Sequence, residues 1–389
     1  MRILHTSDWH LGRSFHGEDM LGVQAAYVDH LIETVDTEAV DLVVVSGDIY
    51  DRALPPVDAV ALADEAFTRL AASRARVVAT SGNHDSARRL GFSSRLVDAA
   101  GVHLRTDAGR AAEPVLIDDE HGPVAVYGIP YLEPDVLHRE WDLPKRSHHA
   151  ALAEAMRRIR ADLARRPPGT RSVVLAHAFV AGGLPSESER DIAVGGISIV
   201  PLELFDGIDY TALGHLHGRA TLTDSVRYSG SPVAYSFSEA THVKGSWMVD
   251  LDAAGLAHVR FIAAPVTRPL ACLTGTIDHL LTEPGLRAHE SSWVQATLTD
   301  ATRPVRAMER LRVRFPNALA LRFAPIGGED VAPRPAAPGR SAHDIALEFV
   351  SHVRGTPATP AESELLQTAL ECCTEDPDLV VQRDAWVSG

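Results

Sequence analysis

The sequence has few cysteines and no long run of apolar residues, and each absence excludes a class of protein. Three cysteines among 389 residues, two of them adjacent at 372 and 373, cannot form a disulfide framework, so we expect reduced thiols and a cytoplasmic location. No run of about 18 apolar residues is present, so we expect no membrane-spanning helix. Residues 1–8 reach polar side chains within a few positions, and we therefore expect no secretory signal peptide.

Positive charge is also scarce. The 37 lysines and arginines are outnumbered by 52 aspartates and glutamates, which gives a formal net charge of −15. This balance argues against broad electrostatic adhesion to nucleic acid or to anionic lipid. A polyanionic substrate would therefore need local positive charge, supplied by metal ions or by a partner. The composition is otherwise that of a globular protein, with 45% hydrophobic and 23% charged residues.

The first part of the chain alternates between apolar runs and segments with helical periodicity. Buried strands are predicted at 1–7, 41–46 and 76–80. Helices are predicted between them, at about 20–40 and 56–72. This order is typical of a parallel sheet with right-handed crossover connections.

Later segments predict a second sheet and two smaller units. Short apolar runs within 101–133 predict a second, mixed sheet, and a basic helix is predicted at 148–166. We expect one large domain over 1–265 and a compact α+β unit of the split βαβ kind over 266–335. A helical tail is expected over 336–389. Its two short amphipathic helices cannot bury their apolar faces on each other alone, so they either pack on their own chain or dock a partner.

Metal-ligating side chains directly follow the predicted strands. They are Asp8, His10, Asp48, Asn83, His177, His215 and His217, with His84 beside them. Such a set suits two metal ions about 3.5–4 Å apart that share a carboxylate. Asp48 follows the central strand and is the expected bridge. A single histidine at a strand end is more often an ordinary polar residue than a ligand, but five such clusters in one order are hard to obtain by accident.

The strand-end motifs resemble those of the calcineurin-like metallophosphoesterase superfamily. The matching stretches are 8–10, 47–51, 82–85, His177 and 214–217. Three further stretches, at 3–12, 186–190 and 228–232, resemble the SbcD-type nucleases within that superfamily, which are relatives of the Mre nuclease of double-strand-break repair. The resemblance implies an α/β fold, namely a four-layer α/β/β/α sandwich with a small α+β capping domain and a helical C-terminal tail.

The resemblance also implies roles for individual residues. It implies one ion held by Asp8, His10, Asp48 and His217. It implies a second ion held by Asp48, Asn83, His177 and His215. His84 would protonate or stabilise the leaving oxygen, and Asp51 would orient His84. Manganese is implied as the metal, although these ligands would also admit iron or zinc.

The substrate and partners implied are those of an SbcCD complex in DNA repair, recombination and replication. The implied activities are exonuclease on double-stranded DNA and endonuclease on single strands or hairpins. An SbcC-type ABC ATPase would bind the tail, and early helices would form a homodimer. Arg88 and Arg89 are candidates for DNA contact, as are the arginines of helix 148–166, for which a solvated helix face is the alternative. A phosphatase or cyclic-nucleotide phosphodiesterase, or a scaffold without metals, remains a rival interpretation.

Overall fold

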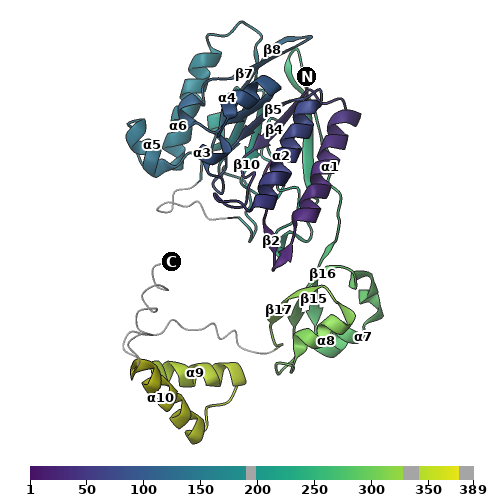
Figure 1. The fold of residues 1–389 in the computed structure, drawn as a ribbon, viewed down its shortest axis with the longest axis vertical. Helices are drawn as coiled ribbons and strands as arrows, with labels where there is room; N and C mark the ends of the chain where they lie inside the picture. Colours follow the sequence, from purple (N-terminus) through teal and green to yellow (C-terminus); the bar gives the residue numbers. More distant parts are fainter. Residues whose placement is uncertain (190–198, 327–340, 376–389) are drawn as a thin grey trace. The chain divides into compact units, whose positions relative to one another are not determined.

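The computed structural model describes residues 1–189, 199–326 and 341–375 (Figure 1). The chain divides into two units, Met1–Ala324 and Pro325–Gly389. Residues 190–198, 327–340 and 376–389 lie outside the described residues, and with them Arg190, the end of the expected 266–335 unit and the end of the tail. The side chains of Cys372 and Cys373 are not described either. Within the described ranges, no helix has both the length and the apolar character needed to cross a bilayer.

The first sheet has six strands in the order β14-β13-β1-β4-β5-β6. Its four parallel strands are β1 (Arg2–Thr6), β4 (Leu42–Ser46), β5 (Arg76–Thr80) and β6 (Val102–Arg105). The hairpin of β13 (Gly245–Asp252) and β14 (Gly255–Ala263) extends the sheet antiparallel to β1. The crossovers are α1 (Leu21–Thr37) and α2 (Val57–Ala72), as the periodicity predicts.

The second sheet also has six strands, in the order β11-β12-β10-β9-β8-β7. Its parallel strands are β8 (Gly122–Ile129), β9 (Arg171–His177), β10 (Tyr210–Gly214) and β12 (Val226–Tyr228). The outer strands β7 (Val115–Asp119) and β11 (Ala220–Thr221) are antiparallel to their neighbours, so the sheet is mixed as expected. The helices that follow β8 in the chain are α5 (Pro134–Glu140) and α6 (His148–Leu163).

Three apolar cores hold the layers together. Side chains of both sheets, among them Val44, Val78 and Leu175, form the middle core. A second core lies between the first sheet and α1 and α2, and a third between the second sheet and α5 and α6. Figure 1 shows α1 and α2 side by side, with α5 and α6 on the opposite side of the sandwich. The predicted four-layer α/β/β/α fold is confirmed.

Residues 270–323, here called the capping domain, belong to the first of the two units and are built on a small sheet with the order β15-β16-β17. Its elements are β15 (Leu270–Gly275), α7 (Ile277–Thr282), β16 (Trp293–Leu298), α8 (Ala307–Arg314) and β17 (Ala318–Phe323). All three strands are parallel and each pairs with the next in the chain. The split βαβ prediction is therefore wrong. Both helices share one core with the sheet. Each helix connects two strands that are direct neighbours, whereas a split βαβ unit has another strand between them.

The tail unit consists of α9 (Ala342–Arg354) and α10 (Pro360–Glu375). The two helices are joined by a hydrogen bond between His343 Nε2 and the Ser363 carbonyl oxygen (3.0 Å) and by an ion pair between Arg354 and Glu362 (2.6 Å). Their apolar faces remain open within this unit, since the side chains of Phe349 and Leu365 are 65% and 71% exposed.

Candidate metal centre

The predicted ligands gather where strands of both sheets end. Asp8, Asp48 and Asn83 follow β1, β4 and β5 of the first sheet, and His177 and His215 lie at the ends of β9 and β10 of the second. The sandwich holds these ends together, because Ser46 of β4 donates a hydrogen bond to the carbonyl oxygen of Ala212 in β10 (2.9 Å). Open α/β sheets place their ligands at this edge.

The first group of ligands consists of Asp8, His10 and His217, whose ligand atoms lie within 4.8 Å of one another. The Nε2 atoms of His10 and His217 are 3.0 Å apart, and Asp48 Oδ2 is 3.6 Å from His10 Nε2. Two ring nitrogens and two carboxylates that converge in this way suit a divalent cation.

The second group is formed around Asn83. Its Oδ1 atom lies 2.8 Å from His177 Nε2 and 3.3 Å from His215 Nδ1. Asp48 Oδ2 is 3.5 Å from the same His177 nitrogen. Asp48 thus faces both groups, which is the arrangement expected of a bridging carboxylate. The structure brings together all seven residues that the sequence predicts as ligands.

In two of the histidines, the hydrogen bond made by the ring nitrogen that faces away from the centre fixes the tautomer of the ring. His177 Nδ1 lies 3.0 Å from the carbonyl oxygen of Ser46, and His217 Nδ1 lies 2.5 Å from Ser188 Oγ. Because a carbonyl oxygen only accepts, His177 Nδ1 carries the proton and its Nε2 lone pair faces the centre. His10 Nδ1 is buried and makes no hydrogen bond to any described residue, although the Asp51 carboxylate lies 3.7 Å from it.

The electrostatics of the centre favour bound cations. Burial, and then the neighbouring Asp48, raises the pKa of Asp8 well above its ordinary value. Burial and the surrounding imidazoles lower the pKa of His10 and of His215 well below theirs. Neutral imidazole is the form that binds metal. Two facing buried carboxylates are costly without positive charge, and divalent cations would supply it.

The backbone is strained at four of the seven ligands. Asp8, His10, Asp48 and His215 have φ values of 53°, 46°, 50° and 108°. Such values cost about 1–3 kcal/mol each for residues with a side chain and persist only where the surroundings enforce them. Hydrogen bonds from Asp8 N to the Gly47 carbonyl and from His10 N to the Asp48 carbonyl (3.1 and 3.0 Å) hold these loops. Four of the nine non-glycine residues with positive φ in the described part of the chain are predicted ligands, and this concentration is an indication of function that is independent of residue type.

Two motif glycines allow the close approach of these loops. A Cβ atom at Gly82 would lie 2.1 Å from Asp48 Oδ1, and one at Gly214 would lie 1.9 Å from the Ser46 carbonyl oxygen. Neither position has space for a side chain. The glycines of these motifs are therefore required by the packing of the ligand loops against one another.

His84 lies at the edge of the centre. Its main-chain nitrogen donates to Asp48 Oδ1 (2.8 Å), and its ring is 4.6 Å from that of His10. His84 Nδ1 lies 2.8 Å from the main-chain oxygen of Asp51, whereas the Asp51 carboxylate is 3.8 Å away. Asp51 is thus placed beside His84 as predicted, but its closest contact is made by the backbone. His84 also lies within ligand distance of His10 and Asp48.

Three buried charged residues that sequence reasoning did not single out support the centre. Asp85 accepts hydrogen bonds from the main-chain nitrogens of Ile49, Tyr50 and Gly82 (3.1, 2.9 and 2.9 Å). Burial, and then Asp48, raises the pKa of Asp85 to about 7. Glu239 and Lys244 form a buried ion pair beside His217. Asp85 could have been found from the sequence, because it is the last residue of the Gly-Asn-His-Asp motif. No local pattern in the sequence marks Glu239 or Lys244.

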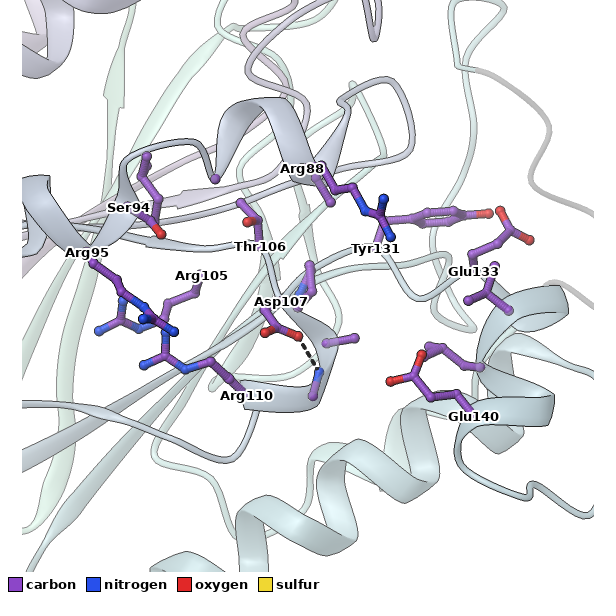
Figure 2. A pocket seen from close by; sticks show the side chains of 18 residues that line it. Arg88, Ser94, Arg95, Arg105, Thr106, Asp107, Arg110, Tyr131, Glu133 and Glu140 are labelled. Atoms are coloured by element: carbon purple, nitrogen blue, oxygen red, sulfur yellow. Dashed lines mark hydrogen bonds between the residues drawn. The ribbon is translucent and has the colours of Figure 1, made fainter.

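The two arginines predicted to contact DNA lie on the short helix α3 (Ala87–Leu90) and are exposed. Arg89 donates to the Ala53 carbonyl oxygen (3.1 Å). Arg88 lines a cavity of about 520 Å³, here called the arginine cavity (Figure 2). Its other charged lining residues are Arg95, Arg105, Asp107, Arg110, Glu133 and Glu140. Tyr131 borders both sites, because it lines this cavity and its ring lies 6.5 Å from that of His177.

Comparison with known families agrees with the fold and the site. Residues 1–219 match the calcineurin-like phosphoesterase family, and this match spans more than half of the chain. The chain belongs to that family. Residues 266–344 match a second family, SbcD_C, described as the type 5 capsule protein repressor C-terminal domain. The phosphoesterase family and the cluster of aspartates and histidines support a metal-dependent hydrolase with a site that fits two divalent ions.

Several solved structures are similar at low sequence identity. A dimetal phosphatase from Danio rerio is 15% identical over 68% of this chain and 99% of that one, with a TM-score of 0.40. TT1561 of Thermus thermophilus is 15% identical over 67% and 98%, with a TM-score of 0.37. Purple acid phosphatase PPD1 from yellow lupin is 13% identical over 68% and 54%, with a TM-score of 0.36. Because these scores are low, the family assignment rests on the sequence match.

Proposed function

We propose that this protein is a DNA nuclease of the SbcD type, acting in DNA repair and recombination. Its proposed activities are exonuclease on duplex DNA and endonuclease on single strands and hairpins. The observation that favours a nuclease over a small-molecule phosphoesterase is the second match, at residues 266–344, which directly follows the phosphoesterase domain. Hydrolysis of a small ester needs neither this domain nor the tail.

Two divalent cations, which we propose are manganese, would be held by the seven strand-end residues. Asp8, His10, Asp48 and His217 would hold one ion, and Asp48, Asn83, His177 and His215 the other. Such a pair lowers the pKa of bound water and neutralises charge on a phosphodiester. The facing nitrogen lone pairs and the strained backbone of the ligands support this assignment.

His84 is the proposed general acid. The Asp51 carbonyl oxygen accepts the Nδ1 proton, which turns Nε2 toward the centre, where it lies 4.0 Å from Asp48 Oδ2. Protonated there, the ring would donate a proton to the leaving oxygen of a phosphodiester seated between the ligands. Asp51 would act by holding the ring in this orientation.

DNA contact is proposed for the arginine cavity and not for α6. Arg157 and Arg158 of α6 pair with Glu154 (both 2.7 Å), and Arg166 pairs with Asp162 (2.9 Å). By contrast, Arg88 and Arg95 make no ion pair or hydrogen bond with any described residue. Unpaired guanidinium groups beside the metal centre are suited to phosphate oxygens.

An SbcC-type ATPase is the proposed partner of the tail, and a second copy of the chain is the proposed partner of α2, α3 and α4 (Ser94–Val97). The exposed Phe349 and Leu365 of the tail suit an apolar docking surface. Around a cavity of about 780 Å³ beside α2, Leu54 and Phe92 are 70% and 82% exposed. Apolar side chains gathered in this way mark an interface.

The test is a comparison of two substrates with manganese present, in the presence and absence of the ATPase subunit. We expect nucleotides to be released from linear duplex DNA, with a small aryl phosphodiester hydrolysed far less efficiently. Efficient hydrolysis of the aryl ester without any DNA cleavage would instead indicate a small-molecule phosphodiesterase. No metal bound to the purified protein and no activity on either substrate would indicate a scaffold.

A further inference from the structure

The metal ligand His217 is held from outside by a buried network. Ser188 is 7% exposed, and its Oγ atom lies 2.5 Å from His217 Nδ1 and 2.6 Å from Glu239 Oε1. Because an ionised carboxylate only accepts, Ser188 donates to Glu239 and accepts the Nδ1 proton of His217. The His217 Nε2 lone pair is thereby directed at His10 Nε2, 3.0 Å away. Partners of this kind set the orientation and basicity of ligating histidines.

The main chain of His217 is held by the same network. Its nitrogen donates to Glu189 Oε1 (2.6 Å), and its carbonyl oxygen accepts from Lys244 Nζ (2.7 Å). Lys244 also pairs with Glu239. Two segments far apart in the chain, 186–189 and 237–244, therefore fix both the ring and the backbone of one ligand.

The capping domain contacts both of these segments. Arg322 of β17 pairs with Glu187 (3.3 Å), and Cys272 of β15 donates to the carbonyl oxygen of Phe237 (3.5 Å). An aromatic cluster reinforces the second contact. The ring of Phe15 lies 5.0 Å from that of Phe237 and 5.3 Å from that of Trp293 in β16. The ion pair is largely exposed and contributes little, whereas Trp293 is buried, so the aromatic contact is the stronger link.

We infer that Ser188 and Glu239 are positioning residues for His217, and that the capping domain holds them in place. The capping domain thus stabilises one half of the metal centre, although it supplies no ligand. This inference rests on the proposed metal centre. It assigns a role to the Ser186–Glu189 segment and explains why a buried Glu–Lys pair lies beside a histidine.

Manganese titration followed by electron paramagnetic resonance tests the inference on the full chain. The wild type should bind two ions and show a spin-coupled pair. Ser188→Ala should bind the ion held by Asp8, His10, Asp48 and His217 about 10–100-fold more weakly, as is typical when a partner of a metal-ligating histidine is removed. The signal should then be that of isolated manganese at concentrations that saturate the wild type. Ser246→Ala is the matched control, because it removes a buried serine hydroxyl that is bonded to Tyr27 (3.1 Å).

The outcomes separate this inference from the proposed function. If the wild type does not bind two ions, the metal centre itself is wrong. If the wild type binds two and Ser188→Ala binds both equally well, only the positioning role is overturned. Trp293→Ala tests the capping domain and should weaken binding of the ion held by His217 severalfold in protein that circular dichroism shows to be folded. Unchanged affinity in that folded variant would overturn the link to the capping domain.

Discussion

The metal centre and the arginine cavity share Tyr131 as a wall but are built in different ways. The ligands are short side chains at strand ends, buried and fixed by strained backbone. The arginines are long side chains on short helices and at the end of strand β6, and two of them already pair with acids. Arg105 pairs with Asp98 (3.0 Å) and Arg110 with Glu113 (2.7 Å). The first region is suited to holding reacting groups at fixed positions, and the second to adjustable contact with a charged chain.

The largest effect is expected from the residue common to both ligand groups. Asp48→Ala should abolish binding of both ions and reduce cleavage by more than the about 10³-fold that loss of one stabilising donor costs. The measurement is metal content by mass spectrometry together with a nuclease assay. Two ions retained in Asp48→Ala would show that Asp48 is not the bridge.

A smaller effect, on chemistry alone, is expected at His84. Because its proposed role is proton transfer, His84→Ala should keep both ions and lose cleavage by about 10²–10⁴-fold, as expected for a general acid. Metal content and single-turnover cleavage should be measured on the same sample. Full activity in this variant would contradict the assignment, and loss of an ion would indicate that His84 is a ligand.

The arginine cavity should respond more weakly and only with DNA. Arg88→Gln should lower affinity for duplex DNA severalfold and reduce the slope of its salt dependence by about one, as expected for one lost phosphate contact. Hydrolysis of an aryl phosphodiester and metal content should not change. Arg157→Gln, in the paired region of α6, is the control. Equal losses in both variants would show that the cavity has no special role.

The tail should matter for assembly but not for the centre. Removal of residues from 340 onward should leave manganese-dependent endonuclease activity intact. It should abolish binding of the ATPase subunit, because the exposed apolar side chains of Phe349 and Leu365 are removed. Co-purification with that subunit is the measurement. Retained association would contradict the docking proposal.

The sequence predicted which side chains converge at the sheet edge because these residues follow apolar strands directly. Asp8, Asp48 and Asn83 each lie within three residues of a strand whose carboxyl end points to one edge. The positions of these side chains follow from local pattern and the rules of parallel sheets. The same patterns predicted a parallel first sheet and a mixed second sheet, whereas the four-layer arrangement was implied by the family resemblance.

The supporting residues were not predictable because they come together only in the folded chain. Glu239 reaches Ser188 across 51 positions, and no periodicity links them. The arginine cavity likewise combines α3, β6 and the residues that follow β8; the sequence marked Arg88 and Arg89, but not the residues that surround Arg88 in the fold. The split βαβ prediction was wrong because strand order depends on which neighbour a crossover reaches, and periodicity does not specify that.

A crystal of the full chain soaked in manganese, with anomalous scattering recorded, tests the central claim most directly. We predict two peaks between the strand ends, with Asp48 contacting both, His217 at one and Asn83 at the other. A single peak, or ions bound away from these side chains, would contradict the account.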